Sequence, residues 1–201
     1  MTSDIKYGLI ILAAGNSSRL GRSKQLLQWK DSSFIKHIAQ EASGVPGCIA
    51  MVITGADREA VETELKDTTI VLSHNADWQS GMSSSIHKGI IQLQSNYPDI
   101  EGTIIAVCDQ PYITNELFLG LLTTHEHTGF GIVASSYADT AGTPVFFSKN
   151  YFEELLLLTG QEGAKKLLAK YEANVSYLPF PNGEVDVDTD ADYNRLIAST
   201  T

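Results

Sequence analysis

The feature that most constrains the fold lies near the start of the chain, where an apolar run changes abruptly into a basic loop that contains glycine. Residues 9–12 are apolar, residues 13–15 read Ala-Ala-Gly, and three cations follow at Arg19, Arg22 and Lys24. A buried strand that opens into a glycine loop is where an α/β protein exposes unpaired backbone N–H groups. Because such groups and nearby cations suit a polyphosphate, the segment predicts an α/β fold with an anion site after its first strand.

The distribution of charge supports the anion site. Residues 1–40 contain six Lys or Arg residues and two acids, a net charge of +4, whereas the whole chain of 201 residues carries −10. An acidic protein with cations gathered around one glycine loop is expected to bind an anion there. The overall negative balance argues against nucleic acid or an anionic membrane as a partner.

Other features of the composition favour a cytoplasmic protein. No apolar run is long enough to span a membrane, and the first strand leads into the glycine loop without a signal-peptide pattern. Cys48 and Cys108 both lie in apolar runs, which predicts reduced thiols in the core.

Strand-like and helix-like segments alternate along the whole chain. The predicted strands are residues 7–12, 48–54, 69–72, 103–108, 131–135, 145–147, 175–180 and 185–188. The predicted helices are one capped by Ser32 or Ser33, then residues 58–65, 84–94, 114–125, 150–158, 162–171 and 190–198, with Thr114 as a cap. This alternation predicts a single domain over residues 1–201, a doubly wound, mostly parallel sheet with helices on both faces.

One acidic residue stands at the expected ligand-binding edge of that sheet. Asp109 follows the apolar run 103–108, and Pro111 stops the strand from continuing. Ligands of such sheets bind beyond the carboxyl ends of the strands, so Asp109 and the glycine loop are expected on the same edge. A carboxylate there suits Mg²⁺, although a helix-capping or turn aspartate would give the same sequence.

Five motifs resemble those of the nucleotidyltransferases that activate small molecules with a nucleoside triphosphate, and within them the molybdenum cofactor cytidylyltransferase group. The first is A-A-G-x-S-x-R-x-G-x-x-K, residues 13–24. The others are Asp-Gln-Pro at 109–111, N-x-x-W-x-x-G-M-x-x-S-I at 75–86, Gly-Thr-Pro-Val at 142–145 with the glycine segment at 160–165, and the acidic segment 186–192. The resemblance implies a nucleotide-diphospho-sugar transferase-like fold and nucleotidyl transfer with release of pyrophosphate.

The resemblance also implies roles for individual residues. It assigns nucleotide binding to Leu12, Ala13, Ala14, Gly15, Asn16, Ser17 and Ser18, and base reading to Asn75, Gly81 and Ser85. Arg19 and Lys24 would neutralise the triphosphate, while Asp109 with Asp188 or Asp186 would hold Mg²⁺. We expect Trp78 to pack beneath the helix that follows it, not to stack on the base.

The acceptor side of the resemblance is looser. Gly142, Thr143, Pro144, Gly163 and Lys165 correspond to acceptor-binding positions. Thr143 replaces a common histidine, Gln161 an acid, and Lys165 an arginine, which grips phosphate differently. The acceptor is therefore a phosphate-bearing small molecule, with molybdopterin as one example and a sugar or polyol phosphate as another. A molybdenum cofactor product would pass to a transient molybdoenzyme or chaperone partner.

The nucleotide and the reaction class each leave an alternative. Ala14 stands where related guanylyltransferases have glycine, and its methyl group predicts a preference for CTP over GTP. Some relatives are described as oxidoreductases, but the sequence lacks the Gly-x-Gly-x-x-Gly fingerprint of dinucleotide binding. A nucleotide-binding module without turnover is a further alternative; Lys24 together with Asp109 favours an active site over it.

Overall fold

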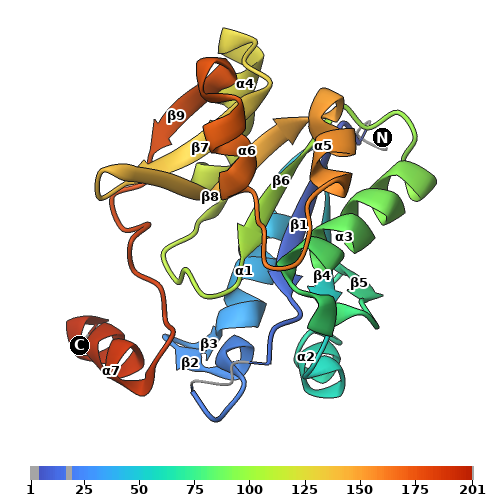
Figure 1. The fold of residues 1–201 in the computed structure, drawn as a ribbon. Coiled ribbons are helices and arrows are strands. Elements are labelled where there is room, and N and C mark those ends of the chain that lie inside the picture. The colour runs from blue at the N-terminus through green and yellow to red at the C-terminus, as the bar shows by residue number, and fades with distance from the viewer. Residues whose placement is uncertain (1–4, 17–19, 201) are drawn as a thin grey trace.

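The structure, a computed structural model, describes residues 5–16 and 20–200. Over these residues one sheet contains seven strands (Figure 1), which in spatial order are β5 (Val71–His74), β4 (Cys48–Thr54), β1 (Tyr7–Ala13), β6 (Gly102–Val107), β8 (Thr140–Ser148), β7 (Ile132–Tyr137) and β9 (Val175–Pro179). Strand β8 runs antiparallel to both of its neighbours, and the other pairs are parallel.

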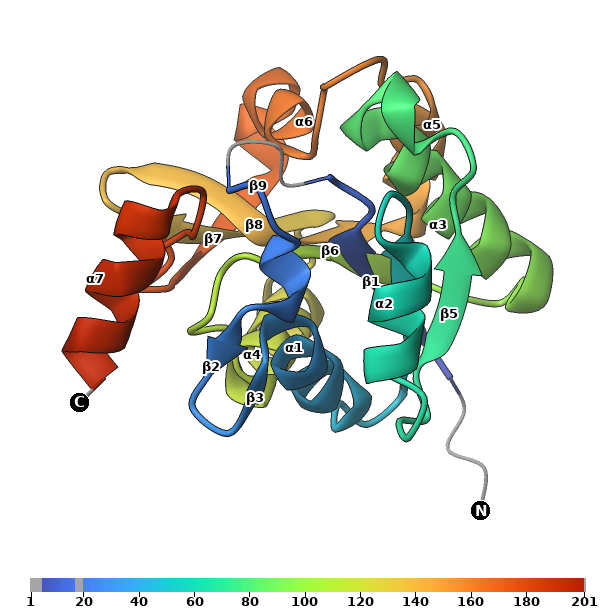
Figure 2. The ribbon, with the colours of Figure 1, turned by 90° about the horizontal axis from the view of Figure 1, so that it is seen from below.

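Helices cover both faces of this sheet, as Figure 2 shows. One face carries α1 (Phe34–Ser43), α2 (Arg58–Glu64) and α4 (Asn115–Thr128), and the other carries α3 (Met82–Asn96), α5 (Phe152–Leu156) and α6 (Lys165–Lys170). The last helix, α7 (Asp190–Thr200), lies away from the sheet beside a hairpin of β2 (Gln28–Trp29) and β3 (Ser32–Ser33). The predicted doubly wound, mostly parallel α/β fold is confirmed.

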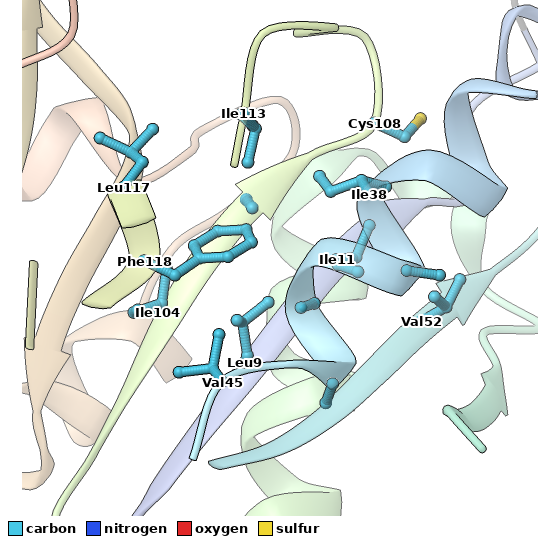
Figure 3. Packing of buried hydrophobic residues seen from close by; sticks show 14 of the residues in the cluster. Leu9, Ile11, Ile38, Val45, Val52, Ile104, Cys108, Ile113, Leu117 and Phe118 are labelled. Atoms are coloured by element: carbon cyan, nitrogen blue, oxygen red, sulfur yellow. The ribbon is translucent and has the colours of Figure 1, made fainter. Parts of the chain in front are cut away.

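The central strand shows why the sequence folds in this way. All seven residues of β1 are buried, as expected for a strand covered on both faces. Because side chains alternate along a strand, Leu9 and Ile11 join one hydrophobic cluster while Ile10 and Leu12 join the other. Figure 3 shows part of the first cluster, in which Leu9 and Ile11 face the helices of one layer.

Two helix starts follow the capping residues predicted from the sequence. The Ser33 hydroxyl accepts a hydrogen bond from the Lys36 backbone N–H at 3.3 Å, and α1 begins directly afterwards. Thr114 caps α4 in the same way through the Leu117 N–H. Both caps confirm the predicted helix positions.

The structure departs from the predicted elements in its last third. Residues 185–188, predicted as a strand, join no sheet; the Val187 N–H donates to the Asp109 carbonyl at 3.2 Å and its side chain is fully buried. The predicted strand 145–147 is the end of the longer β8, which forms a hairpin with β7. The predicted helix 162–171 begins only at α6, because residues 159–164 form a loop. Among the described residues, no helix is both long and apolar enough to cross a membrane.

Candidate functional site

A cavity of about 510 Å³ lies at the carboxyl ends of β1 and β6, the edge predicted for ligand binding. Its walls come from five separate parts of the chain. The lining residues are Leu12, Ala14, Gly15, Asn16, Lys24, Gln25, Trp78, Gln79, Gly81, Met82, Ser85, Val107, Cys108, Asp109 and Gln161.

The loop after β1 forms one wall of this cavity. Of the residues predicted to bind nucleotide there, Leu12, Ala14, Gly15 and Asn16 line the cavity. Ala13 instead packs into the cluster on the α1 side of the sheet. Ser17, Ser18 and Arg19 lie outside the described residues.

Gln25, which sequence reasoning missed, holds this loop in place. Its side chain is 1% exposed, and its Nε2 donates to the Gly15 carbonyl at 2.8 Å and to the Ala13 carbonyl at 3.3 Å. A buried amide that donates to two loop carbonyls fixes their direction and leaves the loop N–H groups to face elsewhere. The only hint in the sequence was that Gln25 follows Lys24 directly.

Lys24 brings two of the predicted carboxylates together. Its Nζ donates a short hydrogen bond to the Asp109 carboxylate and a second one, at 3.2 Å, to Asp188. Burial alone would lower the pKa of Lys24, but the charge of Asp109 and the hydrogen bond to it raise that pKa above its ordinary value. The ammonium group is therefore charged at neutral pH.

Asp188 and Asp186 differ in their surroundings. Asp188 shares Lys24 with Asp109. Burial raises the pKa of Asp186, and the charges of Asp109 and Asp188 raise it further. Within residues 5–16 and 20–200, no group of three or more His, Cys, Asp or Glu residues could hold a metal. The pair of Asp109 and Asp188 fits Mg²⁺, which takes one or two protein carboxylates and completes its shell with phosphate and water.

The predicted base-reading residues lie on the segment from the end of β5 to the first turn of α3, and two of the three line the cavity. Ser85 and Gly81 line the cavity. Asn75 is buried outside that lining; its Nδ2 donates to the hydroxyls of Ser84 and Ser85 at 2.8 and 3.0 Å, and its Oδ1 accepts from the Asp77 N–H. Asn75 thus holds the hydroxyl oxygen of Ser85 in place.

Trp78, which we expect to pack beneath the helix that follows it, also borders the cavity. It lies in a 3₁₀ turn before Gly81, is half-buried, and lines the cavity. In the part of the chain that the structure describes, the three buried hydrophobic clusters do not include it. Packing of its indole beneath α3 stays a prediction.

The glycine segment at 160–165, which resembles an acceptor segment, lies beside the start of α3. The Gly160 carbonyl accepts from both the N–H and the hydroxyl of Ser83, at 3.1 and 3.0 Å. A Cβ on Gly163 would lie 2.7 Å from the Met82 Sδ, and Gln161 lines the cavity. The loop therefore packs on the start of α3. Lys165 does reach β8, where its Nζ donates to the Thr140 hydroxyl at 3.2 Å.

Gly142, Thr143 and Pro144 lie on β8, outside the lining of the cavity. The Thr143 hydroxyl donates to the Gln110 Oε1 at 3.1 Å, and the Gln110 Nε2 donates to the Gly183 carbonyl at 2.8 Å. Gln110 is 5% exposed, so it links β8, the end of β6 and the segment that leads to Asp188. The acceptor-side positions thus connect to the carboxylates through one buried amide.

Two other predicted features are settled by their surroundings. Arg22 forms an exposed ion pair with Asp190 at 2.8 Å and lies over the Tyr193 ring, so it contacts α7 and not the cavity. Burial raises the pKa of both cysteine thiols, Cys48 and Cys108, to about 12, as expected for reduced thiols of the core.

Comparison with known proteins identifies the family of this chain. Residues 9–175 match the family described as the MobA-like NTP transferase domain. The probable molybdenum cofactor guanylyltransferase of Bacillus mycoides (strain KBAB4) is 25% identical over 179 residues, which cover 89% of this chain and 86% of that protein.

Two further similarities concern a redox protein and a metal complex. The nicotine blue oxidoreductase of Paenarthrobacter nicotinovorans is 33% identical over 135 residues, 65% of this chain and 63% of that protein. The crystal structure of Rv0371c from Mycobacterium tuberculosis H37Rv in complex with manganese superposes with a TM-score of 0.72 and 25% identity, covering 97% of this chain and 99% of that one.

Proposed function

Because the chain belongs to the MobA-like NTP transferase domain family, we propose that it transfers a nucleoside monophosphate from a nucleoside triphosphate to a phosphate-bearing small molecule. The observation that carries the proposal is the position of Lys24 and Asp109 on the cavity that the glycine loop borders. A cation and a carboxylate of this kind, next to a glycine loop that follows a strand, are what a triphosphate and its metal ion require.

The reaction needs no covalent enzyme intermediate. An oxygen of the acceptor phosphate attacks the α-phosphorus of the nucleotide, the bond from that phosphorus to the bridging oxygen of the β-phosphate breaks, and pyrophosphate leaves with the bond electrons. Lys24 offsets the negative charge of the triphosphate and of the leaving pyrophosphate, and the loop N–H groups orient the phosphates.

We propose Mg²⁺ as the metal ion, held by Asp109 and Asp188. A bound Mg²⁺ would supply charge neutralisation to the phosphate oxygens. The fit rests on the two carboxylates that converge on Lys24, and the manganese complex of Rv0371c agrees with a divalent cation in a similar protein.

We propose GTP as the donor nucleotide, with CTP as the alternative to be tested against it. The Bacillus mycoides relative, whose match covers 89% of this chain, is named a probable molybdenum cofactor guanylyltransferase. The predicted preference for CTP depends on the Ala14 methyl group. This methyl group packs against the backbone of Gly55: a Cβ added to Gly55 would lie 2.7 Å from the Ala14 Cβ. That contact gives the methyl group a packing role and weakens the steric case for a pyrimidine.

We propose a phosphorylated pterin of the molybdenum cofactor type as the acceptor, following the name of the same relative. The replacements at Thr143 and Lys165 keep a sugar or polyol phosphate as the alternative.

The decisive experiment measures pyrophosphate release from each of the four nucleoside triphosphates, with Mg²⁺ present, with and without each acceptor class. We expect release only when an acceptor is present, and fastest with GTP. Faster release with CTP would restore the cytidylyl assignment. If no triphosphate binds or reacts, the transferase proposal is wrong.

The oxidoreductase name of one relative motivates a second candidate function, reduction with a nicotinamide cofactor. The protein described here, mixed with a reduced nicotinamide dinucleotide, is expected to leave the absorbance of that cofactor unchanged. A saturable spectral change on binding would favour the redox function instead.

A further inference from the structure

Trp78 is a large aromatic side chain that is only partly buried and borders the cavity. It lies half-buried on the cavity, and in residues 5–16 and 20–200 it belongs to none of the three buried clusters. The other tryptophan, Trp29, is 2% exposed and packs within such a cluster. An indole face that borders a cavity offers a flat apolar surface to a ligand with an aromatic ring.

The lining of the cavity comprises two chemically different groups of residues. One group is the glycine loop with Lys24 and Asp109, which suits phosphate and metal ion. The other is the segment 78–85 with Gln161, which has no charged side chain among its described lining residues. A nucleotide whose phosphates contact the charged group has the uncharged group left for its base.

Gln161 is held among these uncharged residues by hydrogen bonds between Ser83 and the preceding residue, Gly160. The Gly160 carbonyl accepts two hydrogen bonds from Ser83, and Gly81, with φ of +104°, lets the two backbones approach. A Cβ on Gly81 would lie 2.2 Å from the Gly160 oxygen. The neighbouring Gln161 side chain is exposed on the cavity and carries one amide donor group and one acceptor oxygen.

We propose that Trp78 stacks on the nucleobase and that Gln161 hydrogen-bonds its polar edge, so that the two residues form the base-recognition wall of the cavity. The inference rests on the proposed nucleotidyl transfer and adds residues to it that neither the sequence motifs nor the relatives assign. Stacking on an indole is indifferent to the identity of the base, whereas an amide distinguishes bases by their donors and acceptors. Trp78 therefore sets affinity and Gln161 sets choice.

The stacking role is tested by separating the base from the phosphates. The full chain and the Trp78→Ala variant are titrated with GTP, CTP and inorganic tripolyphosphate in the presence of Mg²⁺, by calorimetry. We expect the variant to bind both nucleotides roughly tenfold more weakly or worse. Its affinity for tripolyphosphate, which has no base, is expected to stay that of the native chain. Trp78→Phe, which retains a ring, is expected to recover most of the loss.

The role of Gln161 is tested by the ratio of two affinities. Glutamate at this position offers two acceptors and no donor, which suits the two neighbouring N–H groups of guanine and opposes the N–H acceptor pair of cytosine. Gln161→Glu is expected to shift the ratio of the GTP and CTP dissociation constants at least fivefold toward GTP. Gln28→Glu adds the same charge at an exposed position away from the cavity and is expected to leave the ratio unchanged.

The outcomes separate this inference from the proposed function. Native-like nucleotide binding by Trp78→Ala, or an equal loss for nucleotide and tripolyphosphate, would overturn the stacking role while the transferase function stands. An unchanged nucleotide ratio in Gln161→Glu would overturn the reading of the base edge. If the native chain binds tripolyphosphate and neither nucleotide, the proposed function itself fails.

Discussion

At the scale of single residues, the ion triad of Lys24, Asp109 and Asp188 dominates the site. The ammonium group lies between two carboxylates that would otherwise repel each other in a partly buried position. The same two carboxylates are the ones that fit a divalent cation. Lys24 and a metal ion thus compete for one pair of partners, and a nucleotide triphosphate offers Lys24 another partner.

Replacing Asp109 by asparagine tests the metal role directly. Asp109→Asn keeps the shape of the side chain but removes the charge that Mg²⁺ requires, so turnover is expected to fall at least a hundredfold while the melting temperature changes little. The measurement is pyrophosphate release as a function of Mg²⁺ concentration. Near-normal turnover with the native Mg²⁺ dependence would contradict the assignment.

Replacing Lys24 should move two affinities in opposite directions. Lys24→Met removes the competing ammonium group, so Mn²⁺ should bind more tightly in the absence of nucleotide. Loss of one charge-assisted contact, worth about 1.5–3 kcal/mol, should weaken triphosphate binding tenfold or more. Calorimetric titrations with each ligand measure both changes. A parallel loss of both affinities would show that Lys24 only supports the local structure.

Sequence reasoning reached the residues of this triad and left their arrangement open. Lys24 and Asp109 belong to local motifs, which can be located in the sequence alone. The choice between Asp186 and Asp188 depends on how residues 185–188 pass the end of β6, and alternation predicted the same face for both. The position of Trp78 on the cavity could not be predicted either, because an indole near a helix start is usually packed and only the fold shows which segments border the cavity.

At the scale of elements, Gln110 joins three segments that the chain order keeps apart. Gln110 stands at the end of β6. The hydrogen bonds of its side-chain amide reach β8 at Thr143 and the segment before α7 at Gly183. The segment 185–188 was predicted as a strand because it alternates apolar and acidic residues. It stays outside the sheet, with the Val187 side chain buried between α7 and the β2–β3 hairpin. Periodicity does not reveal such tertiary ties.

The Gln110→Met variant measures this tie. Methionine keeps the length of the side chain but leaves the Gly183 carbonyl and the Thr143 hydroxyl without their partner, which should cost about 1–3 kcal/mol in the free energy of unfolding. Denaturant titration gives this value. The matched substitution at an exposed glutamine, Gln28→Met, should change stability by less than about 0.5 kcal/mol. Equal effects of the two substitutions would contradict a structural role for Gln110.

At the scale of the whole molecule, the layers follow from the sequence because nearly continuous apolar runs give buried strands and helical periodicity gives the layers on each face. The antiparallel direction of β8 does not follow in this way. A run of three apolar residues carries no sign of direction, and the turn at residues 138–139, with positive φ at both, makes the hairpin.

One half-buried histidine, His37 on α1, makes the stability of the fold depend on pH. Burial lowers the pKa of His37, with Glu41 and the Ile113 carbonyl opposing that shift. In the unfolded chain, His37 has its ordinary pKa of 6.5 and binds a proton below that pH. In the folded protein the lowered pKa keeps His37 neutral to a lower pH. Stability falls as the pH drops below about that value, by at most about 1.4 kcal/mol per pH unit for one proton.

Denaturant titrations of the native chain and the His37→Gln variant between pH 8 and pH 5 test this dependence. Glutamine can still donate to the Ile113 carbonyl, which lies 3.1 Å from the His37 Nε2, but it does not titrate. The variant is expected to lose less stability than the native chain over this range. Identical pH profiles for the two proteins would show that folding does not lower the pKa of His37.

The close approach of Gly81 and Gly160 has a consequence for how this protein and its relatives can diverge. Any side chain at position 81 would strike the carbonyl of residue 160, so mutation there requires the 159–163 loop to move first. A related protein in which that loop is longer, shorter or displaced could carry a side chain at position 81. It would lose the Gly160 carbonyl that accepts the two hydrogen bonds from Ser83. Inheritance should therefore preserve Gly81, Ser83 and the loop as one unit or exchange them together, and a lineage that changes one alone should be rare.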